Sequence, residues 1–329
     1  MLERFDRHKN NKFGYYLKNY LSLLLPNSIY RHAMPMAPVT ELNRSYIEDR
    51  VNYYHQLVCP FELDQKSVTL RQFRQRSKST YFFDLYQYIR FFPKARFCYQ
   101  FGDVQTVPDV PSFVKSRPIK YNNQTSVLLN LNKIRHFIHV QDPCSFYQKK
   151  SLLVWRGGAY QEHRIRFLEQ YVNHSRCDLG QTNRCRNSHF VKNRMTLAEQ
   201  LQYKFVLSLE GNDVASNLKW IMSSNSLAVM PKPRFETWFM EGRLKPGIHY
   251  VEIRDDYADL EEKMDFYLSH PIAAEAIIEN AKAYASQFQN EALENTIAMR
   301  VIDRYLRLAV HPDLLGESFQ AWGRHLTGD

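Results

Sequence analysis

The chain has 329 residues, which is enough for two domains of about 100–200 residues each. Hydrophobic residues make up 44% of the chain and aromatic residues 14%, which excludes an intrinsically disordered protein. The formal net charge of +10 indicates an anionic partner, either nucleic acid, an acidic membrane surface or a phosphorylated small molecule. Nucleic acid is the least favoured of these, because no zinc-finger, RNP-like or basic-helix signature is present.

The N-terminal segment is basic and aromatic but does not have the pattern of a membrane span. Residues 1–33 hold six Lys or Arg and two acids, interleaved with Phe, Tyr and Leu, and the apolar run at 21–25 ends at Pro26. No secretory signal is recognisable, so we expect a cytoplasmic protein. The segment is either seated on anionic lipid, which would make the protein peripheral on the inner membrane, or is a solvated first helix packed on the body.

The first half of the chain is irregular. Residues 96–104 predict one buried strand that ends at Gly102, which places Asp103 at the exit into a proline-rich loop. Lys115 and Arg117 follow in the same region. They are either contacts for an anionic acceptor or solvated loop cations.

From residue 149 onward, strands and helices alternate. The pattern predicts strands at 151–155, 203–209, 226–230 and 249–253, separated by amphipathic helical segments. Such alternation is typical of a parallel, doubly wound sheet, so the fold class is α/β. The last helix has one apolar side and is long enough to reach back across the first lobe; that side holds Leu293, Ile297, Val301, Tyr305 and Leu308.

Two turns at the ends of predicted strands are candidate phosphate sites, because parallel sheets bind ligands beyond the carboxyl ends of their strands. The first turn offers glycines for close backbone approach and guanidinium groups for a diphosphate, although a tight turn with solvated arginines is equally natural. Small polar residues and a lysine follow the strand 203–209 in the second turn, where plain N-capping of a helix by Asn212, Asp213 or Ser216 is the alternative. The candidates are Arg156, Gly157, Gly158 and Arg164 in the first turn, and Gly211, Asn212, Asp213, Ser216, Asn217 and Lys219 in the second.

Five cysteines form an odd set without a disulfide-scaffold pattern. His174, Cys177, Cys185 and His189 are zinc-ligand types in one short polar segment, but their spacing matches no common zinc module, and we expect an ordinary surface loop. No Walker A, GxSxG, GxGxxG or HExxH motif is present, which disfavours an ATPase, a hydrolase, a dehydrogenase and a metalloprotease.

The run YKFVLSLEGNDVASNLKWIMSSNSLAVMPKPRFETWFMEGRLKPGIHYVEI, with the upstream WRGGAYQEHR, resembles the glycosyltransferase family 90 domain. That family includes animal protein O-glucosyltransferases and xylosyltransferases, fungal capsule enzymes and bacterial lipopolysaccharide-modifying proteins. The sequence of this chain resembles the bacterial branch most. The resemblance spans Phe97 to Phe288. It implies a GT-B fold with two Rossmann-like lobes and a cleft between them: an acceptor lobe at 1–148, completed by the C-terminal helix at 291–329, and a donor lobe at 149–290.

The resemblance also implies chemistry. Family members use UDP-sugars, invert the anomeric carbon and need no metal or other cofactor. Asp103 matches the position of the catalytic base, and an inverting enzyme needs such a carboxylate to take the acceptor proton. Arg156, Gly158 and Arg164 match one donor-contacting segment, and 211–219 matches the other.

Two positions depart from the animal members, because Gly158 replaces a serine and Asn217 an arginine. Glu241, and after it Glu236, are candidates to hold the ribose. We therefore predict transfer of a glucose- or xylose-class sugar from UDP to a hydroxyl of a surface glycan such as lipopolysaccharide. The alternative is a non-catalytic nucleotide-sugar or glycan-binding module.

Overall fold

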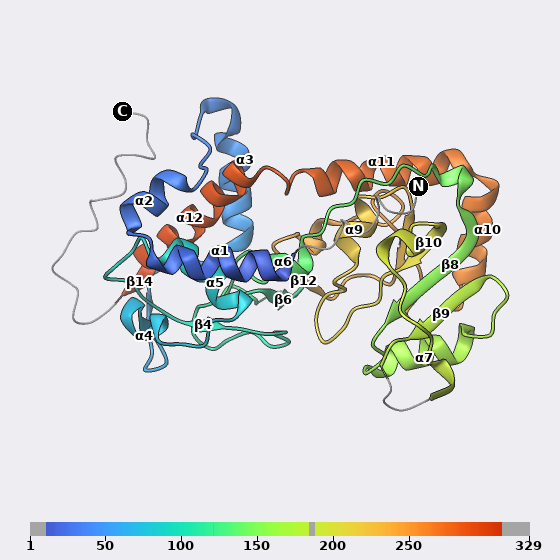
Figure 1. The fold of residues 1–329 in the computed structure, drawn as a ribbon, viewed down its shortest axis with the longest axis horizontal. Helices are drawn as coiled ribbons and strands as arrows, with labels where there is room; N and C mark the ends of the chain where they lie inside the picture. Colours follow the sequence, from blue (N-terminus) through green and yellow to red (C-terminus); the bar gives the residue numbers. More distant parts are fainter. Residues whose placement is uncertain (1–10, 121, 184–187, 311–329) are drawn as a thin grey trace. The chain divides into compact units, whose positions relative to one another are not determined.

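The computed structural model describes residues 11–120, 122–183 and 188–310, which form two compact units (Figure 1). Unit 1 comprises 135–234 and 239–287, and the described part of unit 2 comprises 11–134, 235–238 and 288–310. Across these ranges no helix has both the length and the apolar composition that crossing a bilayer requires.

Unit 1 is built on a five-stranded sheet in which every neighbouring pair is parallel. The strand order is β13-β11-β10-β8-β9, and the central strands are continuous apolar runs that are buried on both faces. The sheet confirms the α/β class. Its strands are β8 (Lys150–Gly157), β9 (Cys177–Gln181), β10 (Tyr203–Leu207), β11 (Leu227–Met230) and β13 (Val251–Glu252).

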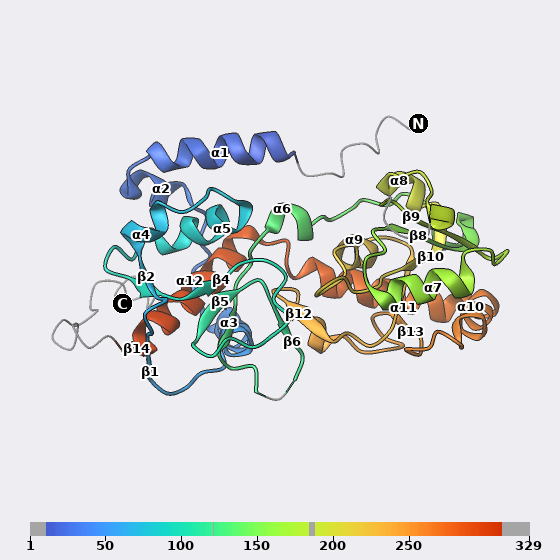
Figure 2. The same cartoon turned by 90° about the horizontal axis from the view of Figure 1, so that it is seen from below.

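Helices alternate with these strands and cover the sheet (Figure 2). In α7 the side chains of Phe167 and Leu168 are buried, and α9 is a single five-residue turn that is buried throughout. Helix α11 packs against α9 and β11. The helices are α7 (Glu162–Tyr171), α8 (Leu197–Gln200), α9 (Leu218–Met222), α10 (Leu260–Ser269) and α11 (Pro271–Ser286).

The chain order of the strands creates a switch point between β8 and β10. After β8 the chain moves outward to β9, then returns to β10 on the other side of β8 and continues outward to β11 and β13. The loops that follow β8 and β10 therefore leave the same sheet edge in opposite directions. Open parallel sheets bind their ligands in the crevice at this point.

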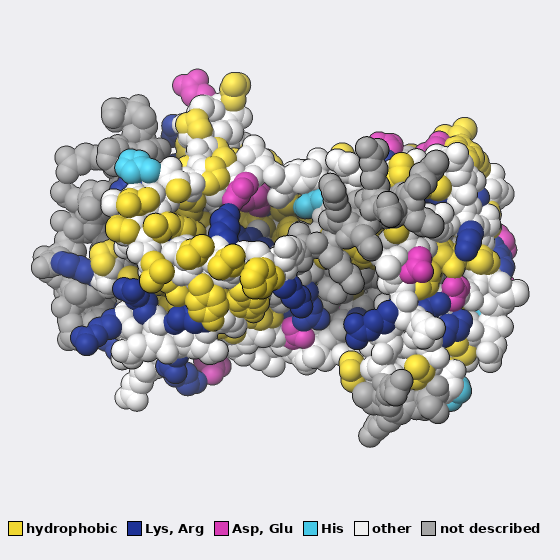
Figure 3. Space-filling view, viewed as in Figure 1, with side chains coloured by type: hydrophobic (Ala, Val, Ile, Leu, Met, Phe, Trp, Pro, Cys, Tyr) yellow, Lys and Arg dark blue, Asp and Glu magenta, His cyan; other side chains and the backbone are white. Residues whose placement is uncertain are grey.

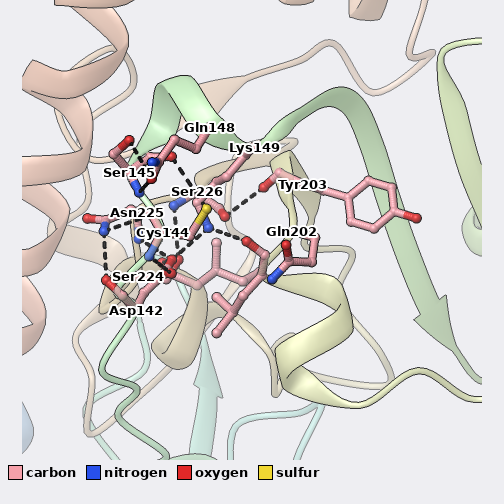
Figure 4. A network of polar contacts seen from close by, with 12 residues as sticks. Asp142, Cys144, Ser145, Gln148, Lys149, Gln202, Tyr203, Ser224, Asn225 and Ser226 are labelled. Carbon is pink, nitrogen blue, oxygen red and sulfur yellow. Dashed lines mark hydrogen bonds and ion pairs between the residues drawn. The ribbon is translucent and has the colours of Figure 1, made fainter. Parts of the chain in front are cut away.

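A buried polar network fixes the segment that leads into β8 (Figure 4). The Lys149 ammonium donates to the Asp142 carboxylate at 2.7 Å and to the carbonyl of Leu201. The backbone N–H of Asn225 donates to the same carboxylate at 2.9 Å. Burial lowers the pKa of Lys149, and the neighbouring Asp142 opposes this. These groups satisfy one another, so the network positions the start of the sheet.

Unit 2 combines helices with several small sheets. Helix α12 (Glu291–Leu308) packs against α3 (Glu41–Tyr54) and α5 (Thr80–Ile89), with Ile297 and Val301 fully buried. A three-stranded parallel sheet has the order β4-β5-β7, and three strand pairs are β1-β14, β2-β3 and β6-β12. The remaining helices are α1 (Lys12–Leu24), α2 (Asn27–Ala33), α4 (Leu70–Arg74) and α6 (Lys133–His136), the last of which runs into unit 1; the strands are β1 (Phe61–Glu62), β2 (Val68–Thr69), β3 (Arg96–Phe97), β4 (Tyr99–Gln100), β5 (Ser112–Val114), β6 (Ser116–Pro118), β7 (Ser126–Leu128), β12 (Phe235–Thr237) and β14 (Ala309–Val310).

A buried ion pair joins α3 to α12. The Arg50 guanidinium donates to both oxygens of Glu294, and the Trp238 indole N–H donates to the same carboxylate. Trp238 also stacks on Tyr54, with the ring centroids 3.7 Å apart. The short segment 235–238 is thereby fixed within unit 2.

Two predictions of local structure were wrong. Residues 96–104 do not form one strand, because β3 pairs with β2 and β4 pairs with β5. Between them the backbone N–H of Cys98 donates to the hydroxyl of Tyr305, a residue of α12, which interrupts the ladder. The segment 174–189 is not simply a loop either, since it contains strand β9.

Candidate functional site

Arg164 joins the two loops at the switch point. Its guanidinium donates to the carbonyl of Gly158 at 2.7 Å, after β8, and to the carbonyls of Leu209 at 2.7 Å and Glu210 at 2.8 Å, after β10. Burial and the nearby Arg135 lower the pKa of Arg164 to about 10, which still leaves it protonated at neutral pH. The segments around Gly158 and Glu210 are thus joined by a half-buried cation.

Positive charge gathers at this edge. The Glu210 carboxylate receives the backbone N–H of Arg234 at 2.9 Å and its side-chain Nε at 3.0 Å. His163 Nε2 lies 2.8 Å from the carbonyl of Glu210, and its pKa is lowered by burial and by the cations Arg234, Arg164 and Arg166. Arg234 thus pairs with the Glu210 carboxylate, while Arg164 donates to the backbone carbonyl of the same residue, and this concentration of cations favours an anionic ligand.

Gly157, the last residue of β8, and Gly158 directly after it leave little room for side chains. A Cβ at Gly157 would lie 2.6 Å from the ring of Trp155, and one at Gly158 would lie 2.6 Å from the ring of Tyr160. Tyr160 is 66% exposed, so it can move aside more easily than the buried Trp155. These contacts are with the chain's own rings, so the close approach of a phosphate to this backbone stays a prediction. Gly157 ends strand β8 and is not part of a turn.

The second loop is held by its own side chains. The carboxamide of Asn217 donates to the carbonyl of Leu207 at 2.9 Å and accepts from the hydroxyl of Ser208 at 3.2 Å. Asn212 accepts a hydrogen bond from Gln161 at 2.9 Å, which adds a second link between the two loops. Helix α9 starts after Asn217, so the alternative that Asn212, Asp213 or Ser216 is its N-cap was wrong.

Lys219 and Glu241 were both predicted to contact the donor. In the structure they form an ion pair with each other. The Lys219 ammonium donates to Glu241, and both side chains are at most 2% exposed. Glu241 opens a short 3-10 helix (Glu241–Arg243) directly after Met240, whose φ of 55° is in the left-handed region. The pair fixes the turn after β12 to the helix after β10.

Arg156 is engaged on the neighbouring strand. Its guanidinium contacts the Asp178 carboxylate at 2.7 Å and the carbonyls of Asp178 and Asn193 at 2.8 and 3.2 Å. Although burial raises the pKa of Asp178, hydrogen bonds from Arg156 and Tyr203 outweigh that effect and hold the pKa at about 2. The role of Arg156 in donor binding stays a prediction.

This pKa gives unit 1 a pH-dependent stability. Because the folded pKa of Asp178 lies below its ordinary value of 3.8, ionisation contributes about 2 kcal/mol above pH 4, which is lost as the pH falls from about 4 to about 2. Urea unfolding at pH 6 and pH 3 should show a loss of about 1 kcal/mol for the wild type from this group, and none of it in Asp178→Asn. The exposed pair of Asp265 with Arg176 provides the control, since Asp265→Asn should leave the pH slope nearly unchanged.

In unit 2, Asp103 and Lys115 form an ion pair with Nζ and Oδ1 2.6 Å apart. The Lys115 side chain is 2% exposed and the Asp103 side chain 30%, so the carboxylate reaches solvent while the lysine lies behind it. Asp103 follows Gly102, whose φ of 100° is a backbone conformation that favours glycine. Lys115 lies between β5 and β6. Lys115 therefore orients the predicted catalytic base.

Arg117 is buried and fully engaged. Its guanidinium donates to Glu236 at 2.7 Å and to the carbonyls of Ser126 and Tyr53 at 3.2 and 2.8 Å. Glu236 also accepts from the hydroxyl of Tyr53. This placement gives no support to an acceptor contact by Arg117 or to a ribose contact by Glu236, and both side chains hold unit 2 together.

The zinc-type residues do not converge in the described part. His174 pairs with Glu261 at 3.2 Å, and burial raises the pKa of the Cys177 thiol to about 12. Within the described ranges, no group of three or more His, Cys, Asp or Glu side chains is arranged to hold a metal ion. Cys185 lies outside those ranges.

The sequence analysis assigned no role to Arg234, His163 or Glu210. Arg234 follows β11 at the same edge at which Gly158 follows β8 and Glu210 follows β10. Its signal was the basic stretch PKPR directly after the apolar strand 226–230. The expectation that ligands bind beyond the carboxyl ends of parallel strands, which located the first two loops, also points to Arg234.

Comparison with known proteins shows the family of the chain. The model of the family described as Glycosyl transferase family 90 matches residues 126–309. The O-glucosyltransferase LpsA of Dichelobacter nodosus is 48% identical over 307 residues, which cover 91% of this chain and 96% of that protein. The uncharacterized protein 035R of Invertebrate iridescent virus 3 is 29% identical over 103 residues, 30% of this chain and 9% of the viral protein. The chain thus belongs to glycosyltransferase family 90.

Proposed function

We propose that this glycosyltransferase moves a hexose or pentose of the glucose or xylose class from a UDP-sugar to a hydroxyl of a surface glycan such as lipopolysaccharide, with inversion and without a metal. The relative from Dichelobacter nodosus is named an O-glucosyltransferase, which makes glucose the first sugar to test. The same proposal includes a GT-B arrangement of the two units, with unit 1 binding the donor.

The observation that carries the proposal is the cationic switch point of unit 1. Arg164, in the helix that follows β8, donates to the carbonyls of Gly158 and Glu210, and Arg234, after β11, donates to the carboxylate of Glu210 at the same end of the sheet. A nucleoside diphosphate presents two negative phosphates to such an edge. The charge also stabilises UDP as it leaves, because positive groups aimed at the departing phosphate act most strongly in the transition state.

Arg234 supplies the charge that Asn217 does not. Its side chain is 61% exposed while its Nε is fixed by Glu210, so the guanidinium is oriented and still accessible to a phosphate. Asn217 instead uses its carboxamide to close the loop after β10. We therefore assign Arg234 the diphosphate contact that an arginine makes from the second donor loop in the animal members.

Asp103 is the proposed general base. Its carboxylate removes the proton of the acceptor hydroxyl as that oxygen attacks the anomeric carbon, and the bond from that carbon to the UDP oxygen breaks. Lys115 holds the carboxylate in one orientation. Since the proposed acceptor is built at the inner face of a membrane, we place the protein there, on the cytoplasmic side.

Calorimetric titration with UDP and with uridine tests the donor site. The Arg234→Ala variant should bind UDP about tenfold more weakly than the wild type, because one charged contact is lost, and should bind uridine equally. Arg307→Ala is the matched control, since Arg307 is 53% exposed and is likewise held through its Nε, by Asp303. Equal UDP affinity of Arg234→Ala and wild type would remove Arg234 from the site, and no binding of UDP by the wild type would contradict the donor assignment.

A further inference from the structure

Helix α1 exposes a continuous apolar face. Its large apolar residues recur every three or four positions, which places them on one side of a helix with 3.6 residues per turn. We call this side the α1 apolar face; its members and their exposed fractions are Phe13 77%, Leu17 49%, Tyr20 49%, Leu21 54% and Leu24 80%. Such residues on a free surface need an explanation, because each exposes apolar area to water.

The opposite side of α1 is fastened to unit 2. The Tyr15 hydroxyl donates to the buried Asp84 carboxylate at 2.8 Å, and the Arg90 guanidinium donates to the carbonyls of Ser22 and Leu25 at 3.0 and 2.7 Å. Ser22 is buried. Edge-to-face contacts of Tyr15, Tyr16 and Tyr20 with Phe83 add to these hydrogen bonds. Tyr20 therefore lies at the margin of the apolar face, while the other members of that face are exposed to solvent.

The exposed apolar residues are concentrated here. In the described part of the chain, 14 large hydrophobic side chains are exposed, and seven of them lie between residues 13 and 29. Two of the seven lie beyond the face itself: Leu25 directly follows α1 and Ile29 belongs to α2. Figure 3 shows hydrophobic side chains gathered over α1, with Lys and Arg side chains around their margin. A scatter of single exposed residues would not produce this concentration.

The charge of this segment has one sign. Residues 11–40 contain no Asp or Glu but include Lys12, Lys18 and Arg31. At 100° per residue, Lys12 and Lys18 fall on either side of the apolar face, and both are exposed. Lysines in these positions can lay their methylene stems along an apolar surface and reach the charged layer above it.

We propose that the α1 apolar face enters the interface of an anionic membrane, with Lys12 and Lys18 at the lipid phosphates. An apolar face flanked by cations and free of acids is typical of helices that lie in the membrane plane. The inference does not depend on the donor chemistry, because α1 belongs to unit 2 and contains none of the residues assigned to UDP. It assigns the membrane contact to one face of one helix.

Flotation of the full-length protein with lipid vesicles tests this surface. The wild type should float with vesicles of one part phosphatidylglycerol to two parts phosphatidylcholine at low salt, and much less with phosphatidylcholine alone. The variant Leu17→Gln/Leu21→Gln/Leu24→Gln should lower the partition coefficient by at least about tenfold. Lys12→Gln/Lys18→Gln should lower it on anionic vesicles and remove most of its salt dependence.

The control carries the same substitution at exposed apolar residues elsewhere. Leu42 is 98% exposed and Ile272 is 80% exposed, and Leu42→Gln/Ile272→Gln should float like the wild type. All variants should keep the melting temperature and the UDP affinity of the wild type, which separates this test from that of the donor site. The proposal would be overturned if the wild type did not float, or if the triple variant floated equally well. It would also be overturned if the wild type were a dimer that bound no vesicles and the triple variant were a monomer.

Discussion

Replacing Asp103 by Asn is expected to lower the rate of sugar transfer by about 10²–10⁴-fold, because the acceptor hydroxyl loses its general base. The affinity for UDP should stay within about twofold, since Asp103 belongs to unit 2 and the proposed donor contacts belong to unit 1. Single-turnover measurement of UDP release with acceptor present, beside calorimetric titration with UDP, checks both parts.

Stability must be controlled in this experiment. Asp103→Asn leaves the ammonium of Lys115, whose side chain is 2% exposed, without its carboxylate, so transfer should be measured well below the melting temperature of the variant. Lys115→Met serves as the matched variant, because it keeps the base and removes its orientation. We expect it to lower kcat less than Asp103→Asn does and to shift the acidic limb of the pH profile upward, since the positive charge that favours the ionised base is gone. Substantial turnover by Asp103→Asn would end the assignment.

The second large effect concerns the buried pair of Lys219 and Glu241. Glu241→Leu should lower the free energy of unfolding by about 3–5 kcal/mol, because it leaves an uncompensated ammonium in the interior. The double variant Lys219→Met/Glu241→Leu should recover most of that loss, since apolar groups of similar volume replace both charges. Urea unfolding of the four proteins gives the coupling energy of the pair.

The same double variant tests the predicted roles of these residues in donor binding. If either residue contacts UDP, the double variant should bind UDP at least about tenfold more weakly than the wild type even though its stability is restored. Wild-type affinity would contradict both donor contacts and leave the pair structural. The exposed pair of Lys282 with Glu279 is the control, and Lys282→Met/Glu279→Leu should change stability by less than about 1 kcal/mol.

The parallel sheet could be predicted because its signal is local. Strands β8, β10 and β11 are short apolar runs that are buried on both faces, and such runs stand out from the amphipathic segments between them. The positions of the two glycine-containing loops followed from that sheet. The bonds that Arg164 makes to the carbonyls of Leu209 and Glu210 did not, since they depend on how residues 45 and 46 positions apart pack together.

Unit 2 resisted prediction for the same reason. Its strands have two or three residues each and pair across long distances in sequence, as when β12 joins β6. The hydroxyl of Tyr305, 207 residues after Cys98, decides where the predicted strand at 96–104 breaks. Local pattern carries no information about such contacts. The proposed role of Asp103 came from family resemblance, while its pairing with Lys115 required the structure.

The most direct test of the account is transfer of ¹³C-labelled glucose from UDP-glucose to lipopolysaccharide purified from cells that lack this protein, in the presence of EDTA. The account predicts a labelled glycan whose new linkage has the anomeric configuration opposite to that of the donor and released UDP in equal amount. With Asp103→Asn, both products should form at least about 10²-fold more slowly. The same experiment is repeated with UDP-xylose. If the protein binds either UDP-sugar tightly but releases no UDP from either, the account is contradicted and the protein is a nucleotide-sugar-binding module.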